Sequence, residues 1–191
     1  MTDPRLVRPA WRGRTNVDAL TVAALEEAER HAGHEFVVTQ GSYQNGAGDP
    51  KSAGTHDGGG VVDLAWCGHD ACIGHLRRAG FAAWLRVPPS FTFHIHAVVV
   101  GHPALALSAA AQVEELRKGG DGLVGSAPDN GPDVPVRAPR WPPRPVRNTV
   151  QKARTAINRA LRDLKAVSPK REAVHRARRE IRDALRKAPK K

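Results

Sequence analysis

The sequence predicts a fold of the α+β class, and three observations support that class. Short runs of alternating or β-branched residues, which are typical of strands, occur at 35–40, 61–65, 81–87 and 91–101. Helical segments are expected before the first run and after the last, and a further helical pattern fills the C-terminal segment. The chain has 191 residues, 40% of them hydrophobic, which is enough to bury a core.

The first helix is expected at 17–33, where Thr15 or Asn16 can cap its beginning and Gly33 can end it. Its apolar stripe consists of Leu20, Ala24, Leu25 and Ala28. Residues 41–60 follow the first strand and are rich in Gly, Ser and Asn. We expect a long, shaped loop there, because a hydrophobic strand follows directly.

The remaining elements of the body alternate between strands and helices. A short helix is expected around Cys72–Arg78, ending at Gly80, before the strand at 81–87. A turn at Pro88 and Pro89 leads to the strand at 91–101, which is the strongest strand pattern in the chain. The last helix of the body is expected at 104–120, where a glycine pair ends it.

The C-terminal part differs in composition from the body, and we divide the chain into a domain at 1–125, a Pro-rich linker at 126–147 and a basic segment at 148–191. Seven of the fifteen prolines lie in 121–147, which predicts a linker or an extended wrap. Apolar residues spaced by three and four predict two amphipathic helices, arranged as a hairpin, in the basic segment. Residues 151–191 hold 15 of the 30 Lys and Arg but 4 of the 19 Asp and Glu, and therefore carry the whole net charge of +11. Such a segment attracts nucleic acid, anionic lipid or anionic wall polymer.

Neither a membrane span nor export by the usual route is expected. No stretch approaches the roughly 18 consecutive apolar residues that a span needs, and the first residues, MTDPRLVRPAWRGR, carry charges without a following apolar region. Cys67 and Cys72 can form a disulfide loop, remain buried thiols, or bind a metal together with His69. Zinc sites usually need four ligands and this stretch supplies three, which argues against a metal. Because no export signal is present, reduced thiols are the expected state.

Asp63 lies within an apolar strand, in VVDLA, where aspartate is uncommon. A buried carboxylate is paired, hydrogen-bonded or bound to a metal, and alone it is as easily structural as functional. In FTFHIHAVVV, alternation places Phe91, Phe93, Ile95, Ala97 and Val99 on an apolar face and turns His94 and His96 to the other face. Two imidazoles and a carboxylate suit zinc, and a catalytic zinc takes three protein ligands and leaves a position for water.

The order and spacing of these residues resemble the signature of the LAS metallopeptidases, a family named for lysostaphin, D-alanyl-D-alanine carboxypeptidase and sonic hedgehog. His56, six residues and Asp63 are followed far downstream by the pair His94 and His96. The details SxGTHxGGGxxDL and HIH look especially like carboxypeptidase-type endolysins and related peptidases of actinobacteria and their phages. The resemblance covers residues 35–125 and implies a central, mostly antiparallel sheet flanked by helices.

The resemblance implies that His56, Asp63 and His96 bind one catalytic zinc ion and that His94 is the catalytic histidine. Gly58, Gly59 and Gly60 are expected to let the chain turn sharply between the first two ligands. The other six histidines are not expected to be ligands: His31, His34, His69, His75, His102 and His175. Trp66 and Trp84 are interpreted as core or as the wall of a cleft.

Two departures from the family pattern bear on the mechanism. Carboxypeptidases of the family have a glutamate just before the HxH pair, yet no acidic residue occurs between Asp70 and Glu114. We expect His94 to act as the base, with Asp57, Glu35 and Asp121 as alternatives. Where the family often has an arginine, the substrate-binding residues are expected to be Gln40, Ser42 and Tyr43, with Gln44 beside them. A neutral amide binds a peptide carbonyl but does not neutralise a terminal carboxylate, which favours an endopeptidase.

The sequence therefore supports two hypotheses. In the first, the chain is a zinc peptidase that cuts the peptide part of peptidoglycan, stays in the cytoplasm until its release, and holds to the anionic wall through its basic helices. In the second, the metal is not catalytic and the basic helices bind nucleic acid or another polyanion. The 15 basic residues of 151–191 have no interleaved aromatic residues, so they give no sign of base stacking.

Overall fold

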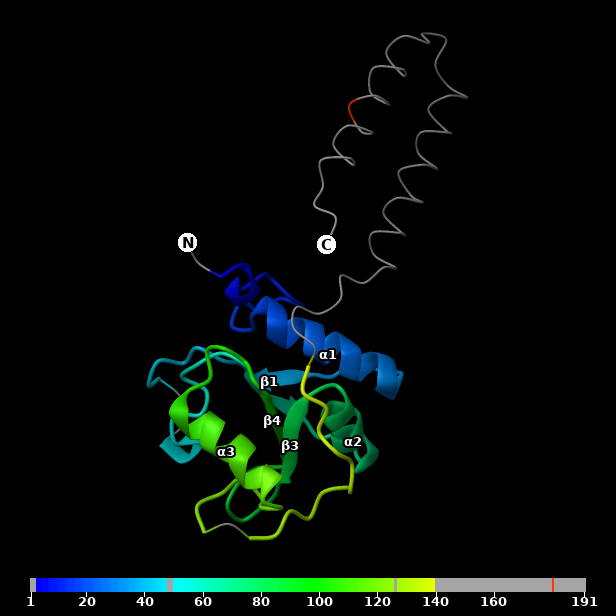
Figure 1. Ribbon diagram of the computed structural model, residues 1–191, viewed down its shortest axis with the longest axis vertical. Coiled ribbons are helices and arrows are strands. Elements are labelled where there is room, and N and C mark those ends of the chain that lie inside the picture. The colour runs from blue at the N-terminus through cyan, green and yellow to red at the C-terminus, as the bar shows by residue number, and fades with distance from the viewer. Residues whose placement is uncertain (1–2, 48–49, 126, 140–179, 181–191) are drawn as a thin grey trace. The chain divides into compact units, whose positions relative to one another are not determined.

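A computed structural model describes residues 3–47, 50–125, 127–139 and 180. These residues form a four-stranded sheet and three α-helices, which confirms the α+β class (Figure 1). The strands lie in the order β1 (Val38–Gln40), β2 (Val61–Ala65), β4 (His94–Val99) and β3 (Phe81–Arg86). Every neighbouring pair is antiparallel, as the resemblance implied.

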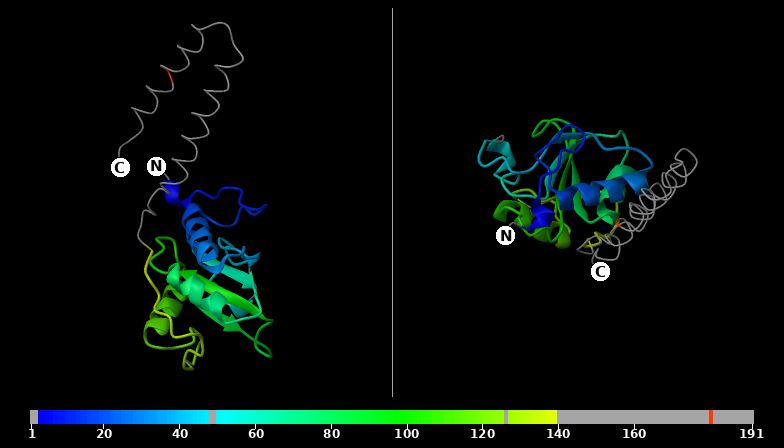
Figure 2. Two further views of the ribbon diagram at one scale, coloured as in Figure 1. Left: turned by 90° about the vertical axis from the view of Figure 1, so that its right-hand side faces the viewer. Right: turned by 90° about the horizontal axis from the view of Figure 1, so that it is seen from above.

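The helices cover the two faces of this sheet (Figures 1 and 2). Helices α1 (Ala19–Ala32) and α2 (Ala71–Arg78) pack on one face, and α3 (Leu107–Arg117) packs on the other. The core beneath α1 and α2 contains Leu25, Ile73, Leu64, Ile95 and Phe81 among its buried side chains. A smaller core joins Val113 of α3 to Trp84 and Val98 of the sheet. Strands β2, β3 and β4 therefore contribute to both cores, whereas β1 contributes Val38 to the core beneath α1 and α2.

The beginning of α1 differs from the expectation that Thr15 or Asn16 caps it. The cap is Asp18, whose backbone is extended and whose Oδ1 accepts a hydrogen bond of 2.8 Å from the Thr21 amide. A carboxylate that accepts from the first turn satisfies one of the unpaired amides of a helix. The predicted end is confirmed, because Gly33 adopts a left-handed backbone with φ of 75°.

Strand β4 begins at His94, three residues later than expected. The neighbouring strands explain the difference, because His94 pairs with Ala65, the last residue of β2, and with Arg86, the last residue of β3. The preceding residues thus have no strand beside them, and Phe93 is 58% exposed, which contradicts its place in the expected apolar face. Ile95, Ala97 and Val99 are fully buried, as expected for that face.

The described part of the Pro-rich segment lies along the body. Arg77 of α2 is 3% exposed; its Nη1 donates to the Pro132 carbonyl at 2.7 Å and lies 2.9 Å from the Asp129 carboxylate. These contacts correspond to the extended wrap, one of the two forms that the sequence allowed for this segment. The predicted basic helices at 148–191 lie outside the described residues apart from Glu180, which is helical. No described helix is long and apolar enough to cross a membrane.

Candidate metal centre

The register of the sheet places four polar or aromatic side chains in one row across it. Gln40 of β1 pairs with Asp63 of β2, Asp63 pairs with His96 of β4, and His96 pairs with Trp84 of β3. Directly opposed residues in an antiparallel pair project to the same face of the sheet. The face is the one that carries α3, so the alternation expected for Asp63 and His96 is confirmed.

The loop at 41–60 brings His56 to this row. Its two arms are held together by hydrogen bonds from the Tyr43 amide to the Gly58 carbonyl at 2.9 Å and from the Gln44 amide to the His56 carbonyl at 3.0 Å. His56 is 1% exposed, and its Nε2 lies 3.3 Å from Asp63 Oδ1. His96 Nδ1 lies 2.8 Å from the same oxygen. One ligand atom from each of the three residues lies within 4.8 Å of the other two.

The outer hydrogen bonds of the two histidines fix which ring nitrogen faces Asp63. His56 Nδ1 donates to the Gly41 carbonyl at 2.9 Å, and His96 Nε2 donates to Gln112 Oε1 at 2.9 Å. In a neutral imidazole the other nitrogen then carries a lone pair. Two lone pairs and a carboxylate oxygen therefore converge on one point, which is the usual environment of a metal ion with its outer partners in place.

Burial and charge favour the protonation states that a metal requires. Burial alone raises the pKa of Asp63, but the contacts with the imidazoles of His56 and His96 outweigh burial and hold the pKa below its ordinary value. Burial lowers the pKa of His96, and the neighbouring Asp63 carboxylate, which acts in the opposite direction, does not restore it to the ordinary value. The nearby Arg86 guanidinium also disfavours a charged His96. The site thus combines an anionic carboxylate with a neutral imidazole, as metal ligation demands.

His94 lies beside this group without being part of it. Its Nδ1 donates to the Thr92 carbonyl at 2.8 Å, and its Nε2 lies 3.8 Å from Asp63 Oδ2. The Nε2 lone pair is therefore directed toward the three converging residues. The His94 side chain is 17% exposed, more than that of His56 or His96, so it is open to a ligand in the neighbouring cavity.

All four of these residues line a cavity of about 1240 Å³. Its walls come from residues 51–55, the segment 88–93 that follows β3, one side of α3 and the turn at 122–125. A cavity with a few converging polar groups is the usual form of a ligand-binding site.

The three substrate-binding residues expected from the sequence are placed differently. Gln40 lines the cavity, but Ser42 and Tyr43 are absent from the described lining. Ser42 is fully buried, and its hydroxyl donates to the Val61 carbonyl at 2.6 Å. The Tyr43 hydroxyl donates to Asp18 Oδ2 at 2.6 Å. Both side chains therefore hold the loop in place.

The three acidic residues considered as alternative bases also make their hydrogen bonds and ion pairs with residues other than His94 and the three candidate ligands. Asp57 Oδ1 accepts from the Gly46 amide at 2.7 Å, Asp121 Oδ1 accepts from the Leu123 amide at 3.0 Å, and Glu35 pairs with Arg12 at 3.5 Å. None of the three belongs to the described lining of the cavity.

Helix α3 supplies two cavity residues that the sequence reasoning missed. Gln112 bonds His96, and Glu115, whose carboxylate also pairs with Lys118 at 2.9 Å, lines the cavity. The helical spacing of these residues was visible in the sequence. The lining residues of this helix recur at intervals of three and four along one face, namely Ser108, Ala111, Gln112 and Glu115.

The three glycines before β2 serve two purposes. Gly60 has φ of 79°, as expected for a sharp turn. Gly58 and Gly59 instead permit close approach: a Cβ on Gly58 would lie 2.3 Å from the Ala104 carbonyl oxygen, and one on Gly59 would lie 2.4 Å from the Tyr43 hydroxyl. The run therefore packs the loop against the segment after β4.

The fold and the site together define a small antiparallel α+β protein with a buried His–Asp–His group at the wall of a cavity. Comparison of the chain with models of known protein families, with curated proteins and with solved structures found no match. The function proposed below therefore depends on the chemistry of these residues and on the resemblance of their motif.

Proposed function

We propose that this protein is a zinc-dependent peptidase that hydrolyses peptide bonds in peptidoglycan, in the manner of an endolysin. The observation that carries the proposal is the convergence of His56 Nε2, Asp63 Oδ1 and His96 Nδ1 at the wall of a cavity, with His94 beside them. The peptidoglycan substrate is supported by the resemblance of the motif alone.

The donor set fits zinc. Two neutral imidazoles and one carboxylate are the ligands of many catalytic zinc sites, which keep one position for water or substrate. The three residues share a cavity wall, so a substrate can approach the ion from the cavity side. When bound, zinc supplies a nucleophilic water near neutral pH and polarises the carbonyl of the bond to be cut.

His94 is assigned the proton transfers. Its Nδ1 is held by the Thr92 carbonyl, so its Nε2 is free of the ring proton and can accept one from the attacking water. The same nitrogen can then deliver the proton to the leaving amine. The family glutamate that normally acts as the base is missing from this chain. Glu115 is an acidic residue of the cavity wall that could take over its role, so it competes with His94 as the candidate base.

Gln40 supports an endopeptidase. It is the member of the expected substrate-binding set that lines the cavity, and its amide can hydrogen-bond a peptide carbonyl. Arg86 also lines the cavity; its Nη1 donates to the Asp121 carbonyl at 2.8 Å, and its buried Nη2 has no hydrogen-bond partner among the described residues. We assign the recognition of a backbone amide to Gln40.

The basic segment at 148–191 is proposed to hold the enzyme against anionic wall polymer, on the basis of its charge. A chain that ends at residue 147 should still cut soluble peptidoglycan fragments but bind walls more weakly at low salt. If binding to nucleic acid were the function instead, this truncation would remove the function entirely.

Clearing of suspended cell walls tests the proposal. Wild-type protein should lower the turbidity, a chelator should stop the clearing, and added zinc should restore it. His96→Ala should not clear walls. His31→Ala should clear them normally, because His31 pairs with Glu27 at 3.1 Å on the surface of α1 and is not among the described cavity residues. Equal clearing by the His96→Ala variant would contradict the proposal.

A further inference from the structure

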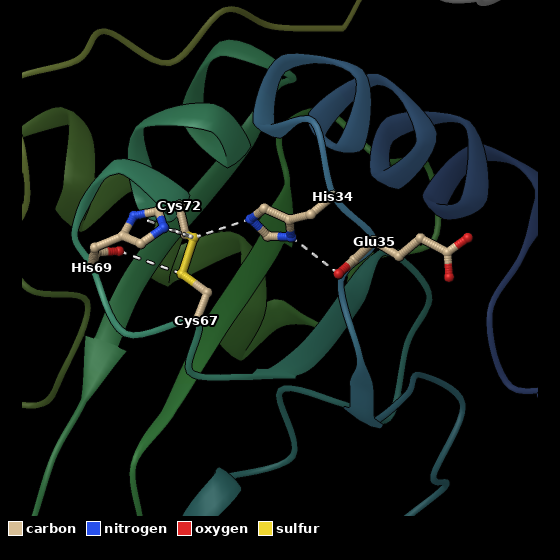
Figure 3. Close-up of a disulfide and its surroundings, with 5 residues drawn as sticks. All are labelled: His34, Glu35, Cys67, His69 and Cys72. Carbon is tan, nitrogen blue, oxygen red and sulfur yellow. Dashed lines mark hydrogen bonds between the residues drawn. A yellow bond between two sulfur atoms is a disulfide. The ribbon is translucent and has the colours of Figure 1, made fainter.

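A second cluster of metal-ligating side chains lies on the opposite side of the sheet from the cavity, at the ends of α1 and α2. Cys67 and Cys72 are joined in a disulfide, which differs from the reduced thiols expected from the sequence. The imidazoles of His34 and His69 point toward the sulfur of Cys72 from two sides (Figure 3). His34 follows α1, and the other three residues lie between β2 and the first turn of α2.

The distances in this cluster match those between ligands of a tetrahedral metal site. Zn–S and Zn–N bonds of about 2.3 and 2.0–2.1 Å at a tetrahedral angle place sulfur and nitrogen ligands about 3.6 Å apart. Cys72 Sγ lies 3.6 Å from His34 Nε2, and it lies 3.7 Å from Nδ1 and 3.8 Å from Nε2 of His69, either of which can be the ligand atom. One ligand atom from each of these three residues lies within 4.8 Å of the other two.

The outer contact of His34 prepares it as a ligand. Its Nδ1 lies 3.1 Å from the Glu35 carbonyl and donates to it, so the lone pair of the neutral ring is on Nε2, the nitrogen that faces Cys72. A backbone carbonyl bonded to the far nitrogen is the common outer partner of a metal-bound histidine. The arrangement is thus more specific than a chance meeting of polar side chains.

We propose that His34, Cys67, His69 and Cys72 form a second metal site, for a divalent ion of the zinc class, when the disulfide is reduced. Cys67 supplies the fourth ligand because its sulfur is bonded to that of Cys72. It is half-buried and precedes Gly68, around which a Cβ would meet no atom within 4 Å. Gly68 has φ of 88° and the conformational freedom of glycine, so the backbone beside Cys67 can adjust as the two sulfurs separate to about 3.8 Å around the ion.

The disulfide and the ion are alternative states of the same four residues. A dithiol reductant delivers two electrons and two protons to the disulfide, which becomes two thiols while the reductant forms its own disulfide. Each thiol then loses its proton as its sulfur binds the ion. Oxidation reverses these steps and releases the ion.

The expected role of this site is structural. Four protein ligands leave no position for water or substrate, unlike the three ligands that meet at the cavity. The bound ion would tie the segment after α1 to the loop before α2, and both helices pack on the same face of the sheet. The site is independent of the proposed peptidase activity.

Cobalt binding to the full-length chain tests the proposal, because only a thiolate ligand gives an intense sulfur-to-cobalt absorption band in the near ultraviolet. Reduced, metal-free wild type should show this band on addition of Co²⁺, and oxidised protein should not. The His96→Ala variant should keep the band, since it lacks only the ligand at the cavity. Wild type should bind two zinc ions per chain when reduced and one when oxidised. The His96→Ala variant should bind one zinc ion when reduced and none when oxidised.

Surface variants identify the histidine ligands without disturbing the core. His34 and His69 are both exposed, so the double variant H34Q/H69Q should fold and should lose the band at a cobalt concentration that saturates wild type. The matched control H31Q, which changes a neighbouring surface histidine, should keep it. A reduced wild type without the band, or an H34Q/H69Q band as strong as that of wild type, would overturn the proposal.

Discussion

Asp63 and His96 face each other across the β2–β4 pair, and 2.8 Å separates Asp63 Oδ1 from His96 Nδ1. The sheet itself sets this distance, because directly opposed residues of an antiparallel pair carry side chains on the same face. A shift of one residue in register would turn His96 into the core beneath α1 and α2. Two of the three candidate ligands are therefore positioned by the rigid part of the fold, and the loop at 41–60 adds the third.

The outer partner of His96 should control the affinity for metal. Gln112→Ala removes the acceptor of the His96 Nε2 proton, and with it one of the contacts that orient the ring. Loss of such a partner typically weakens metal binding about 10–100-fold. Competition with a chelator of known affinity measures the change. Gln112→Glu keeps an acceptor at this position and should retain tighter binding than the alanine variant; equal affinities for the two variants would contradict this role.

Replacement of His94 should lower the rate of hydrolysis without lowering the amount of bound metal. His94→Ala keeps the three converging residues, so zinc content should stay at the wild-type value while hydrolysis falls about 10²–10⁴-fold, the usual contribution of a general base. Zinc analysis and the initial rate on soluble peptidoglycan fragments measure the two effects. Glu115→Gln is the paired test: a large loss there, with little loss in His94→Ala, would assign the base to α3.

Replacing a crowded glycine by alanine should lower the stability of the fold, whereas replacing a glycine with space around it should raise it. Gly58→Ala places a Cβ 2.3 Å from the Ala104 carbonyl oxygen, and a backbone atom does not move cheaply, so we expect a loss of about 1–3 kcal/mol or more in the free energy of unfolding. Gly74→Ala, inside α2, meets its nearest atom at 3.5 Å and should gain about 0.5–1 kcal/mol. Urea denaturation measures both. Similar losses in the two variants would show that crowding at Gly58 is not the cause.

The buried carboxylate of Asp18 should make stability depend on acid pH. It caps α1, accepts from Tyr43, and lies 3.0 Å from His102 Nε2. Burial raises its pKa, but the interactions with His102, Tyr43 and Thr21 outweigh burial and hold the pKa below the ordinary value of 3.8. The resulting stability is complete above that value and is lost as the pH falls toward the folded pKa.

Asp18→Asn removes this dependence. The free energy of unfolding of the variant should be lower than that of wild type near neutral pH, and the difference should shrink as the pH falls below the ordinary carboxyl pKa of 3.8. Urea denaturation at several pH values measures it. A difference that stays constant across this range would mean that Asp18 does not titrate differently in the folded and unfolded chains.

The sequence could predict those parts of the protein that depend on local patterns. Alternation in VVDLA and HIHAVV placed Asp63 and His96 on the correct face, and Gly33 marked the end of α1. Local patterns could not show that β4 begins only where β2 and β3 provide partners. Nor could they show that the Asp18 carboxylate, two or three residues after the expected caps, would contact Tyr43 and His102.

The missed residues of the two sites share one cause. Gln112 and Glu115 lie on a helix that the sheet brings to the cavity, and His34 lies 33 residues before Cys67, so no spacing rule connects them to their partners. Ser42 and Tyr43 show the converse. Their polar groups suggested substrate contacts, but the fold uses them to hold the loop.

Mass spectrometry of the fragments released from purified peptidoglycan tests the central claim most directly. Zinc-loaded protein should release fragments with new amino termini inside the peptide part, and the His96→Ala variant and chelated wild type should release none. If zinc-loaded wild type releases no fragment, or if His96→Ala releases the same fragments, then His56, Asp63 and His96 do not form the catalytic metal site of a peptidoglycan peptidase.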